Sequence, residues 1–293
     1  MLSAIVSSKR DPASRNILNC LLEICSWNKT GISLKGNEIL QCDETNSLLI
    51  TIDSDLTSAE FLSELPILVE RLIFISRHEA TSKKPSLLIH FTGNWTSNAM
   101  LGGYPNTLGI SDPIFAKYAF IEILREKEKR DRLSEFEISL EATHHGPTQL
   151  NKPLTFIEIG SDPDKWRNKE AGEAWAHAII RALERLQRKK DYKNLVVAIG
   201  FGGPHYAPNF SKVERETCIA MGHIAPKYVI DQISPHVLRQ AYLKNMVKPK
   251  LALIDWKGLT GAQREKVITL LKELNFNLEI VKIHTALRKY STT

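Results

Sequence analysis

The sequence predicts an α/β fold in which a mixed or mostly parallel sheet is covered by helices on both faces, giving three layers. Short apolar, β-branched runs recur along the 293 residues, and several are near-continuous, as in strands that are buried on both faces. Amphipathic helical patterns lie between these runs. Alternating strands and helices are typical of doubly wound α/β architectures, whose sites collect at the carboxyl ends of strands.

Ten segments are expected to form strands and four to form helices. Two helices are expected to begin at Asp11-Pro12 and at Asp112-Pro113, since an aspartate can cap a helix and a proline suits its first position. The other two helices are expected over residues 168–190 and 260–274. The expected strands are, in order, MLSAIV, SLLITID, RLIFIS, PSLLIHF, FEISLEATHH, LTFIEIGS, NLVVAIGF, TCIAMGHI, LALIDW and NLEIVKI.

The chain carries no low-complexity linker, internal repeat or convincing domain boundary, so a single elaborated α/β domain over residues 1–293 is expected. A basic C-terminal subregion, residues 236–293, could be semi-independent. The formal charge is +6, which permits a nucleic-acid partner without requiring one. After His236 there are eleven basic and four acidic residues, and a solvated face and a phosphate-binding face both fit that pattern.

Other features narrow the class of protein. No apolar run approaches the roughly 20 residues of a membrane-spanning helix, and the first residues do not resemble a signal peptide, so a soluble, cytoplasmic protein is expected. The four cysteines form no C-x-x-C pair. Serine hydrolases, P-loop ATPases and Rossmann dehydrogenases are disfavoured because their motifs, and the H-E-x-x-H metal motif, do not occur.

Six predicted strand ends carry polar clusters, and together they contain most of the histidines in the chain. We expect them to converge on one rim of a single sheet. Because histidine is the common metal ligand and moves protons near neutral pH, this convergence predicts a hydrolytic or metal site. The histidines are His78, His90, His144, His145, His205 and His223.

Glu158 is the natural carboxylate partner, since it lies between two isoleucines in an apolar strand where an unpaired charge would be costly. A structural glutamate bonded to backbone or arginine is the alternative. His144 and His145 are adjacent, so on a regular strand they would point to opposite faces. Both can reach one ion only if the chain bends at Gly146 and Pro147.

The remaining clusters carry weaker signals. Thr92, Gly93 and Asn94 could polarise a carbonyl or form a plain turn. The segment GGPHYAP, with its glycines at Gly202 and Gly203, is expected to be a rigid binding loop. His223 could be a ligand or a core residue, and a structural role is favoured for His78 and His177.

Taken together and in order, DPAS, SRHEA, HFTGNW, ATHHGPT, FIEIGS, GGPHYAP and GHIAPKY resemble the D-aminoacyl-tRNA deacylase family of the archaeal and plant type. The resemblance runs from Asp11 to about Tyr228. It implies a phosphorylase- or hydrolase-like α/β fold related to peptidyl-tRNA hydrolase, a zinc cofactor, and hydrolysis of the ester that joins a D-amino acid to tRNA. Such an enzyme protects translation from tRNAs that are mischarged with a D-amino acid.

On this hypothesis each cluster receives a role. The residues expected to be catalytic are His144, His145, Asn94 and Glu158, and those expected to bind substrate are Thr92, Gly93, Gly202, Gly203 and Tyr206. The expected zinc ligands are His144, His145, Glu158, His205 and His223. The basic residues of the last sixty positions would hold the acceptor stem of the tRNA, and the protein would be a monomer or a homodimer.

Two alternatives stay open at this stage, besides a weaker one, nucleoside phosphorolysis, which only the fold resemblance suggests. One is a metal-free, peptidyl-tRNA-hydrolase-like esterase in which histidine and asparagine activate water. The other is a tRNA-binding module without chemistry.

Overall fold

The larger of the two main sheets has eight strands in the computed structural model, which describes residues 2–188 and 194–292. The strand order is β2-β3-β4-β1-β5-β10-β6-β9. Strands β4, β1, β5 and β10 are parallel, whereas β6 and β9 run antiparallel to β10 and parallel to each other. The bounds are β1 (Ser3–Ser8), β2 (Asn28–Leu34), β3 (Asn37–Cys42), β4 (Ser47–Ile52), β5 (Arg71–Glu79), β6 (Ser86–His90), β9 (Glu137–Leu140) and β10 (Leu154–Ser161).

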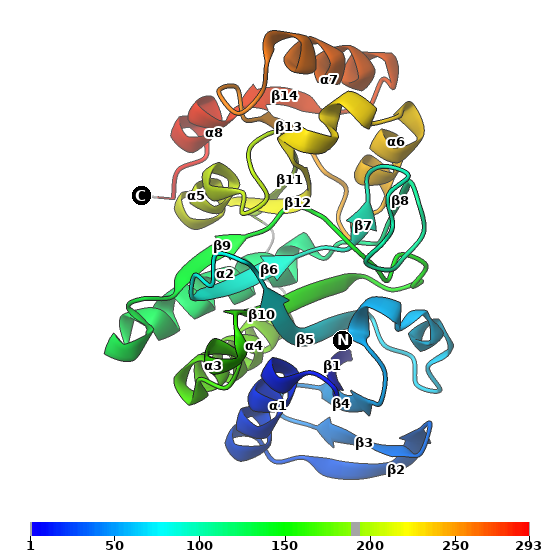
Figure 1. Ribbon diagram of the computed structural model, residues 1–293, viewed down its shortest axis with the longest axis vertical. Helices are drawn as coiled ribbons and strands as arrows, with labels where there is room; N and C mark the ends of the chain where they lie inside the picture. Colours follow the sequence, from blue (N-terminus) through cyan, green and yellow to red (C-terminus); the bar gives the residue numbers. More distant parts are fainter. Residues whose placement is uncertain (1, 189–193, 293) are drawn as a thin grey trace.

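A second, fully parallel sheet of four strands follows in the C-terminal third of the described chain, in the order β12-β11-β13-β14. Figure 1 shows it at the opposite end of the molecule from β2 and β3. A two-stranded ribbon, β7 (Gly93–Asn94) with β8 (Thr107–Leu108), lies beside it. The four strands are β11 (Val196–Phe201), β12 (Ile219–Ala225), β13 (Leu251–Ile254) and β14 (Glu279–Lys282).

The helices begin where the sequence places capping residues. The Asp11 side chain accepts a hydrogen bond from the Ser14 amide at 2.9 Å, and Asp112 caps its helix through Phe115, which confirms both Asp-Pro starts. The α-helices are α1 (Pro12–Ile24), α2 (Pro113–Glu128), α3 (Pro163–Trp166), α4 (Lys169–Gln187), α5 (Pro208–Glu216), α6 (Pro235–Leu243), α7 (Gly261–Glu273) and α8 (Ile283–Lys289). Short 3₁₀ helices are η1 (Leu56–Ser58), η2 (Glu60–Glu64), η3 (Asp131–Leu133) and η4 (Lys227–Gln232).

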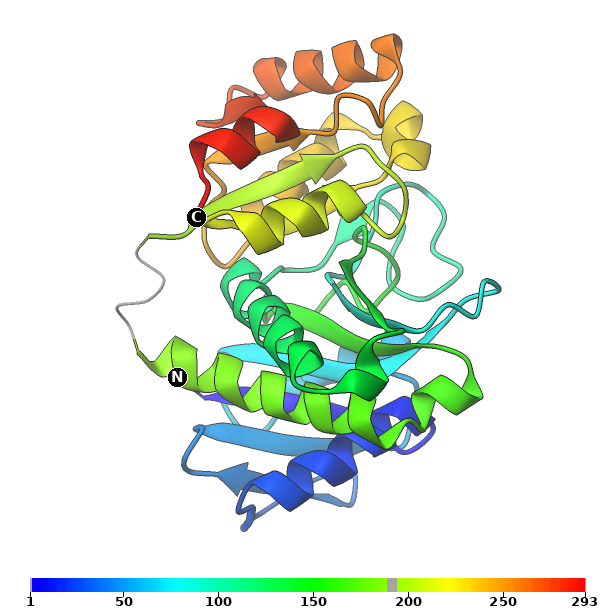
Figure 2. The same ribbon diagram turned by 90° about the vertical axis from the view of Figure 1, so that its left-hand side faces the viewer.

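Helices α1, α2 and α4 cover one face of the large sheet, and Figure 2 shows them in front of its strands. One buried hydrophobic cluster on this side joins Ile157 of the large sheet to Val197 and Leu253 of the second sheet. Helices pack on both faces of the second sheet as well. The predicted α/β class with layered helices is confirmed. No helix among the described residues is long and apolar enough to cross a membrane.

Several expectations differ from the structure, and four of the described α-helices, α3, α5, α6 and α8, were not predicted. The predicted strand FEISLEATHH ends at Leu140, so His144 and His145 lie in an irregular segment beyond it. The polar strand ends lie on two sheets, so the expectation of one rim on a single sheet is wrong. The β2–β3 hairpin was missed because β2 is mostly exposed and carries no apolar run. Met1 and the last two residues of the expected helix 168–190 lie outside the described residues.

Candidate metal centre and active site

The site is built on the face of the large sheet that the helices leave open, around Glu158 in β10. Successive side chains of a strand point to opposite faces, so Ile157 and Ile159 enter the helix-side core while Glu158 points the other way. In register, Glu158 lies opposite Ser76 of β5 and Leu88 of β6. His78 and His90 each follow two residues later on those strands and therefore share the face of Glu158.

Glu158 is buried and contacted from both neighbouring strands. The Ser76 hydroxyl donates to its Oε1 at 2.6 Å, His78 Nδ1 lies 3.3 Å from Oε2, and His90 Nε2 lies 3.5 Å from Oε1. Burial opposes the charge, but the charge of His90 and the hydrogen bond of His78 outweigh it and hold the pKa of Glu158 well below its usual range. Glu158 is therefore a fixed anion beneath the site.

The pKa values of the two histidines beside Glu158, His78 and His90, are shifted in the opposite direction, upwards. Burial alone would lower the pKa of His78, but its hydrogen bond to Glu158 and the charge of Glu141 raise it. Burial also opposes charge on His90, yet the charge of Glu158 raises the pKa of His90. The negative charge of the site is thus balanced by the rings that touch it.

A second buried carboxylate, Glu141, follows directly after β9. Its Oε1 lies 3.1 Å from His205 Nε2 and 3.4 Å from His78 Nδ1. Neither of its carboxylate oxygens has a partner with hydrogen-bond geometry in the described chain, although the residue is only 2% exposed. Because buried polar atoms are nearly always satisfied, such an acid signals a missing cation or water.

The chain bends at His145 and brings the adjacent histidines to one side. His145 has a φ of 46°, in the left-handed region, and the ring centroids of His144 and His145 are 4.4 Å apart. The Gly93 amide supports the bend by donating to the His145 carbonyl at 2.8 Å. A side chain at Gly146 would overlap the backbone of Gly103, so only glycine fits there. The chain therefore turns where the bend was predicted: the positive φ is at His145, and the Gly146–Pro147 peptide that follows is cis.

Four histidines of the site share one bonding pattern: each ring is held through Nδ1, which leaves Nε2 for the interior. The Nδ1 atoms of His90, His144 and His145 lie 3.2, 2.8 and 2.7 Å from the carbonyl oxygens of Phe91, Ala142 and Gly146. His205 Nδ1 lies 3.0 Å from the Tyr228 hydroxyl. A backbone carbonyl can only accept, so the first three rings donate from Nδ1, and a neutral ring then carries its lone pair on Nε2.

The rings at the bend are also kept neutral. Burial, followed by the positive charge of His90, lowers the pKa of His144 well below its usual value. The same two causes lower the pKa of His145 to about 3. Neutral imidazole is the form that binds metals, so both rings are in the ligating state at physiological pH.

Three overlapping sets of side chains could each hold a metal ion, with ligand atoms within 4.8 Å of one another. They are His90, His144 and His145; Glu141, His144 and His205; and His78, Glu141 and Glu158. We call these seven residues the histidine–carboxylate cluster. The cluster lies at the base of a cleft of about 660 Å³, whose lining includes His78, His144, His145, Glu158 and His205. On its rim, Met100 and Leu101 are strongly exposed.

The other predicted site residues lie elsewhere. His223 is fully buried outside the cluster; its Nδ1 lies 3.2 Å from the Thr143 hydroxyl and its Nε2 lies 3.0 Å from the Lys244 carbonyl. Asn94 donates both amide hydrogens to the carbonyls of Gly102 and Tyr104, so it supports a loop at the cleft rather than facing a substrate.

Thr92 and Gly93 pair with the segment that carries His144, through a parallel bridge and the Gly93 amide. Gly202 and Gly203 pack against the loop after β13, where Cβ atoms would meet Leu259 and Asp255. These four residues therefore shape the segments around the cluster, and none of them lines the cleft.

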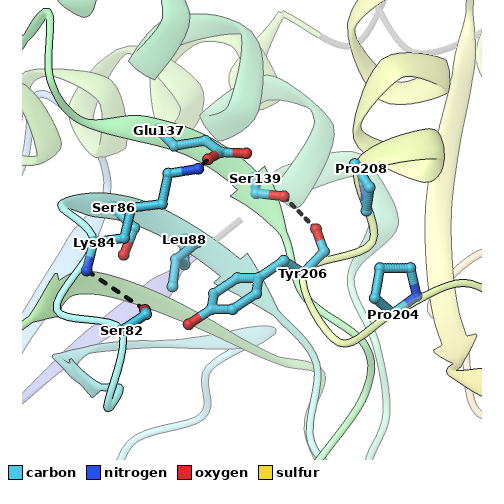
Figure 3. A pocket seen from close by; sticks show the side chains of 9 residues that line it. All are labelled: Ser82, Lys84, Ser86, Leu88, Glu137, Ser139, Pro204, Tyr206 and Pro208. Carbon is cyan, nitrogen blue, oxygen red and sulfur yellow. Dashed lines mark hydrogen bonds and ion pairs between the residues drawn. The ribbon is translucent and has the colours of Figure 1, made fainter. Parts of the chain in front are cut away.

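Tyr206 connects the cluster to a smaller pocket. Its hydroxyl lies 2.9 Å from His78 Nε2, and its ring forms one wall of a cavity of about 200 Å³ (Figure 3). Leu88 and two prolines give this pocket an apolar lining, and Lys84 forms an ion pair with Glu137 at the end away from Pro204. The ring of Tyr206 thus faces the small pocket while its hydroxyl reaches the cluster.

Sequence reasoning missed some members of the cluster. His90 was one of the converging histidines but received no role, and His78 was interpreted as structural. Glu141 was not singled out, although it lies between Leu140 and Ala142, an acid in an apolar run as Glu158 is. That pattern was the available signal. Nothing in the sequence pointed to the contact between Tyr228 and His205.

The fold and the site define an α/β enzyme of the hydrolase class, with a cleft lined by histidine and carboxylate side chains. A family model described as D-aminoacyl-tRNA deacylase matches residues 66–279. The D-aminoacyl-tRNA deacylase of Thermococcus onnurineus (strain NA1) is 36% identical over 286 residues, which cover 96% of this chain and 100% of that protein. The enzyme of the same name from Pyrococcus furiosus is 34% identical with the same coverage. The chain belongs to the D-aminoacyl-tRNA deacylase family, as the ordered motifs predicted.

A solved structure agrees with the fold. The crystal structure of a conserved protein of unknown function superposes with a TM-score of 0.88 at 26% identity, and the match covers 100% of this chain and 99% of that one. The whole architecture, including both sheets, is therefore shared with that protein.

Proposed function

We propose that this chain hydrolyses the ester bond of D-aminoacyl-tRNA to release a D-amino acid and free tRNA, with a zinc ion held in the histidine–carboxylate cluster. Family membership supports the reaction. The observation that supports the metal is that His144 and His205, whose rings are each held through Nδ1, lie with their second nitrogens beside Glu141, a buried carboxylate that has no hydrogen-bond partner in the described chain.

The donor set fits zinc. Zinc binds imidazole nitrogen and carboxylate oxygen, and catalytic sites commonly use two histidines and one glutamate, keeping a position open. Glu141, His144 and His205 make such a set. Ala142 and Tyr228 hold the outer nitrogens of the two rings, as outer-shell partners of metal-bound histidines do. His90 and His145 form a neighbouring group with His144. Of these two rings, neutral His145 is the further donor, whereas the raised pKa of His90 favours its charged form.

When bound, zinc polarises the ester carbonyl and lowers the pKa of a coordinated water towards neutrality. The protein side chains orient and balance the charges. Neutral His145 lines the cleft and can accept a hydrogen bond from the attacking water at Nε2. Glu158 stays anionic, and its contacts hold His78 and His90 in place. Its negative charge offsets positive charge that accumulates at the site. A hydrogen bond between the Tyr206 hydroxyl and Nε2 of His78 fixes the orientation of that ring.

The test is a deacylation assay with the purified, zinc-loaded chain and with matched D- and L-aminoacyl-tRNA carrying the same amino acid. We expect release of the D-amino acid at a rate far above that of the L-isomer. Glu122→Gln is the control for substitutions of acids in the histidine–carboxylate cluster. Glu122 is also a buried acid, but it is paired with Arg125 and Arg185 on the helix side of the sheet. Failure of the wild-type chain to release the D-amino acid would overturn the proposal.

The metal-free esterase is separated from this mechanism by chelation. If zinc is required, a chelator abolishes turnover and added zinc restores it. Full activity in a protein shown to be free of metal would establish the alternative instead.

A cytoplasmic location remains part of the proposal, because charged tRNAs are made and used in that compartment.

A further inference from the structure

We propose that the carboxyl-terminal edge of the second sheet binds the single-stranded 3′ end of tRNA and leads it to the histidine–carboxylate cluster. This inference rests on the proposed function, since it concerns how the substrate of that site approaches it. The proposed RNA-binding edge consists of Lys227, Tyr228, Trp256, Lys257, Arg264 and Lys282.

The four parallel strands of this sheet end level with one another. Ala225 of β12 pairs with Phe201 of β11, Phe201 pairs with Ile254 of β13, and Ile254 pairs with Lys282 of β14. Strands lie about 4.8 Å apart, so three spacings give a continuous edge of roughly 14 Å. Ligands of parallel α/β sheets bind outside this edge, because the loops there point the same way.

A groove of about 490 Å³ occupies this edge, between the loops that follow β11, β12 and β13. Its lining includes Pro204 from the first loop, Lys227 and Tyr228 from the second, and Lys257 from the third. One acid also lines it, Asp231, whose carboxylate accepts a hydrogen bond from Gln263 at 2.8 Å. The charged side chains of the groove are therefore two lysines and one aspartate, and its aromatic ring is that of Tyr228.

The cations of the edge are not neutralised by the protein. Lys227, Lys257, Arg264 and Lys282 have no carboxylate within 4.0 Å among residues 2–188 and 194–292. Two of them lie over the Trp256 ring, at 4.7 Å for Arg264 and 3.9 Å for Lys282. Arg264 also donates to the carbonyls of Trp256 and Leu259. Cations without a carboxylate partner, next to exposed aromatic rings, suit single-stranded nucleic acid, because phosphates contact the cations and bases stack on the rings.

Tyr228 links the edge to the cluster. It is 59% exposed, so its ring is open to a base, while its hydroxyl lies 3.0 Å from His205 Nδ1. A base stacked on Tyr228 would be held next to the ring that the proposed function assigns to zinc binding. The ester at the 3′ terminus would then lie at the cluster while the rest of the strand follows the groove.

The basic residues of the last sixty positions were expected to hold the acceptor stem, but only some of them lie at the proposed RNA-binding edge. Lys250 immediately precedes β13 and Lys272 lies in the last turn of α7, so both are at the opposite edge of the same sheet. Both side chains are exposed. They supply a matched control, with the same charge on the same sheet but away from the cluster.

The test measures binding of uncharged tRNA by the full chain, which needs no turnover and so is independent of the proposed reaction. We compare Lys227→Ala/Lys257→Ala with Lys250→Ala/Lys272→Ala, after confirming equal melting temperatures. The edge variant is expected to bind about 10- to 100-fold more weakly, and its log–log salt slope should fall by about 1.4, for two lost phosphate contacts. The control variant should stay within about twofold of wild type.

A second comparison locates the 3′ end. Wild type should bind intact tRNA about tenfold more tightly than tRNA lacking its single-stranded 3′ nucleotides, since stacking of a base contributes about 1–3 kcal/mol. Tyr228→Ala should lose this preference and Tyr228→Phe should keep it. The proposal is overturned if wild type does not bind tRNA, if the edge and control variants behave alike, or if Tyr228→Ala retains the preference. Deacylation by an edge variant at the wild-type rate and affinity would also overturn it, while leaving the proposed function standing.

Discussion

His144 and His223 were both predicted to bind metal, and their surroundings show why residue type alone does not decide that role. Among the described residues, the His144 ring forms a hydrogen bond only through Nδ1, and its Nε2 faces other histidines and a carboxylate. His223 bonds through both nitrogens, to Thr143 and to the Lys244 carbonyl, with aromatic rings around it. Burial lowers the pKa of both, that of His223 to about 4. A neutral, buried histidine can therefore bind a metal only where its second nitrogen has no partner.

The largest effect is expected from Glu141→Gln, which removes the carboxylate of the proposed zinc set while nearly keeping its volume. Loss of a metal that contributes about 4 kcal/mol to transition-state stabilisation corresponds to roughly a 10³-fold fall in kcat/KM. Deacylation kinetics with zinc content measured on the same sample would check this. Unchanged activity and zinc content would remove Glu141 from the site.

His144→Ala and His223→Ala test the comparison directly. The His144→Ala variant should lose zinc, and its kcat should fall by about 10²- to 10³-fold. Its stability should change little, because the His144 ring is only partly buried. His223→Ala should keep its zinc but lose about 2–3 kcal/mol of unfolding free energy, because it leaves a cavity and unpaired Thr143 and Lys244 groups. Denaturant unfolding with metal analysis separates the two variants, and a reversed pattern would contradict our assignment.

Gly146→Ala should distort the bend that brings His144 and His145 together. A Cβ at this position would meet the backbone of Gly102 and Gly103, which no side-chain movement can relieve. We expect a destabilisation of about 1–3 kcal/mol and a marked loss of zinc affinity. Isothermal titration with zinc measures the second effect. Normal zinc binding in this variant would show that the bend is not required.

Tyr206→Phe should have the smallest effect. It removes one hydrogen bond to His78 but keeps the ring that walls the small pocket. A single hydrogen bond contributes about 0.5–1.5 kcal/mol, so kcat should fall by about 3- to 10-fold with unchanged zinc content. A loss as large as that of Glu141→Gln would place the Tyr206 hydroxyl in the chemistry itself.

Much of the fold was predictable because it depends on local signals. The near-continuous apolar runs gave ten strands, and the Asp-Pro starts gave two helices with the expected caps. The two-sheet division was not predictable, since an apolar run does not reveal which strands it pairs with. The β2–β3 hairpin is largely exposed and lacked the pattern that identified the others.

The site was predictable in composition but not in geometry. The order of the motifs identified the family, and the strand ends supplied most of the cluster. Which histidines have a free nitrogen depends on hydrogen bonds to distant partners, such as Thr143 to His223, 80 residues apart. Glu141 and His78 acquire their roles from contacts between β5, β9 and the loop after β11. The contacts of Glu141 with His205 and of Thr143 with His223 exist only once the two sheets come together, and the contact of Glu141 with His78 only once β5 and β9 lie in one sheet.

The most direct test of the central claim is a crystal of the zinc-loaded chain with anomalous scattering recorded at the zinc absorption edge. We predict an anomalous peak within ligand distance of His144 Nε2, His205 Nε2 and a Glu141 oxygen, at about 2.0–2.2 Å from each. The account would be contradicted by a peak at His223, or by a fully active crystal form with no peak in the histidine–carboxylate cluster.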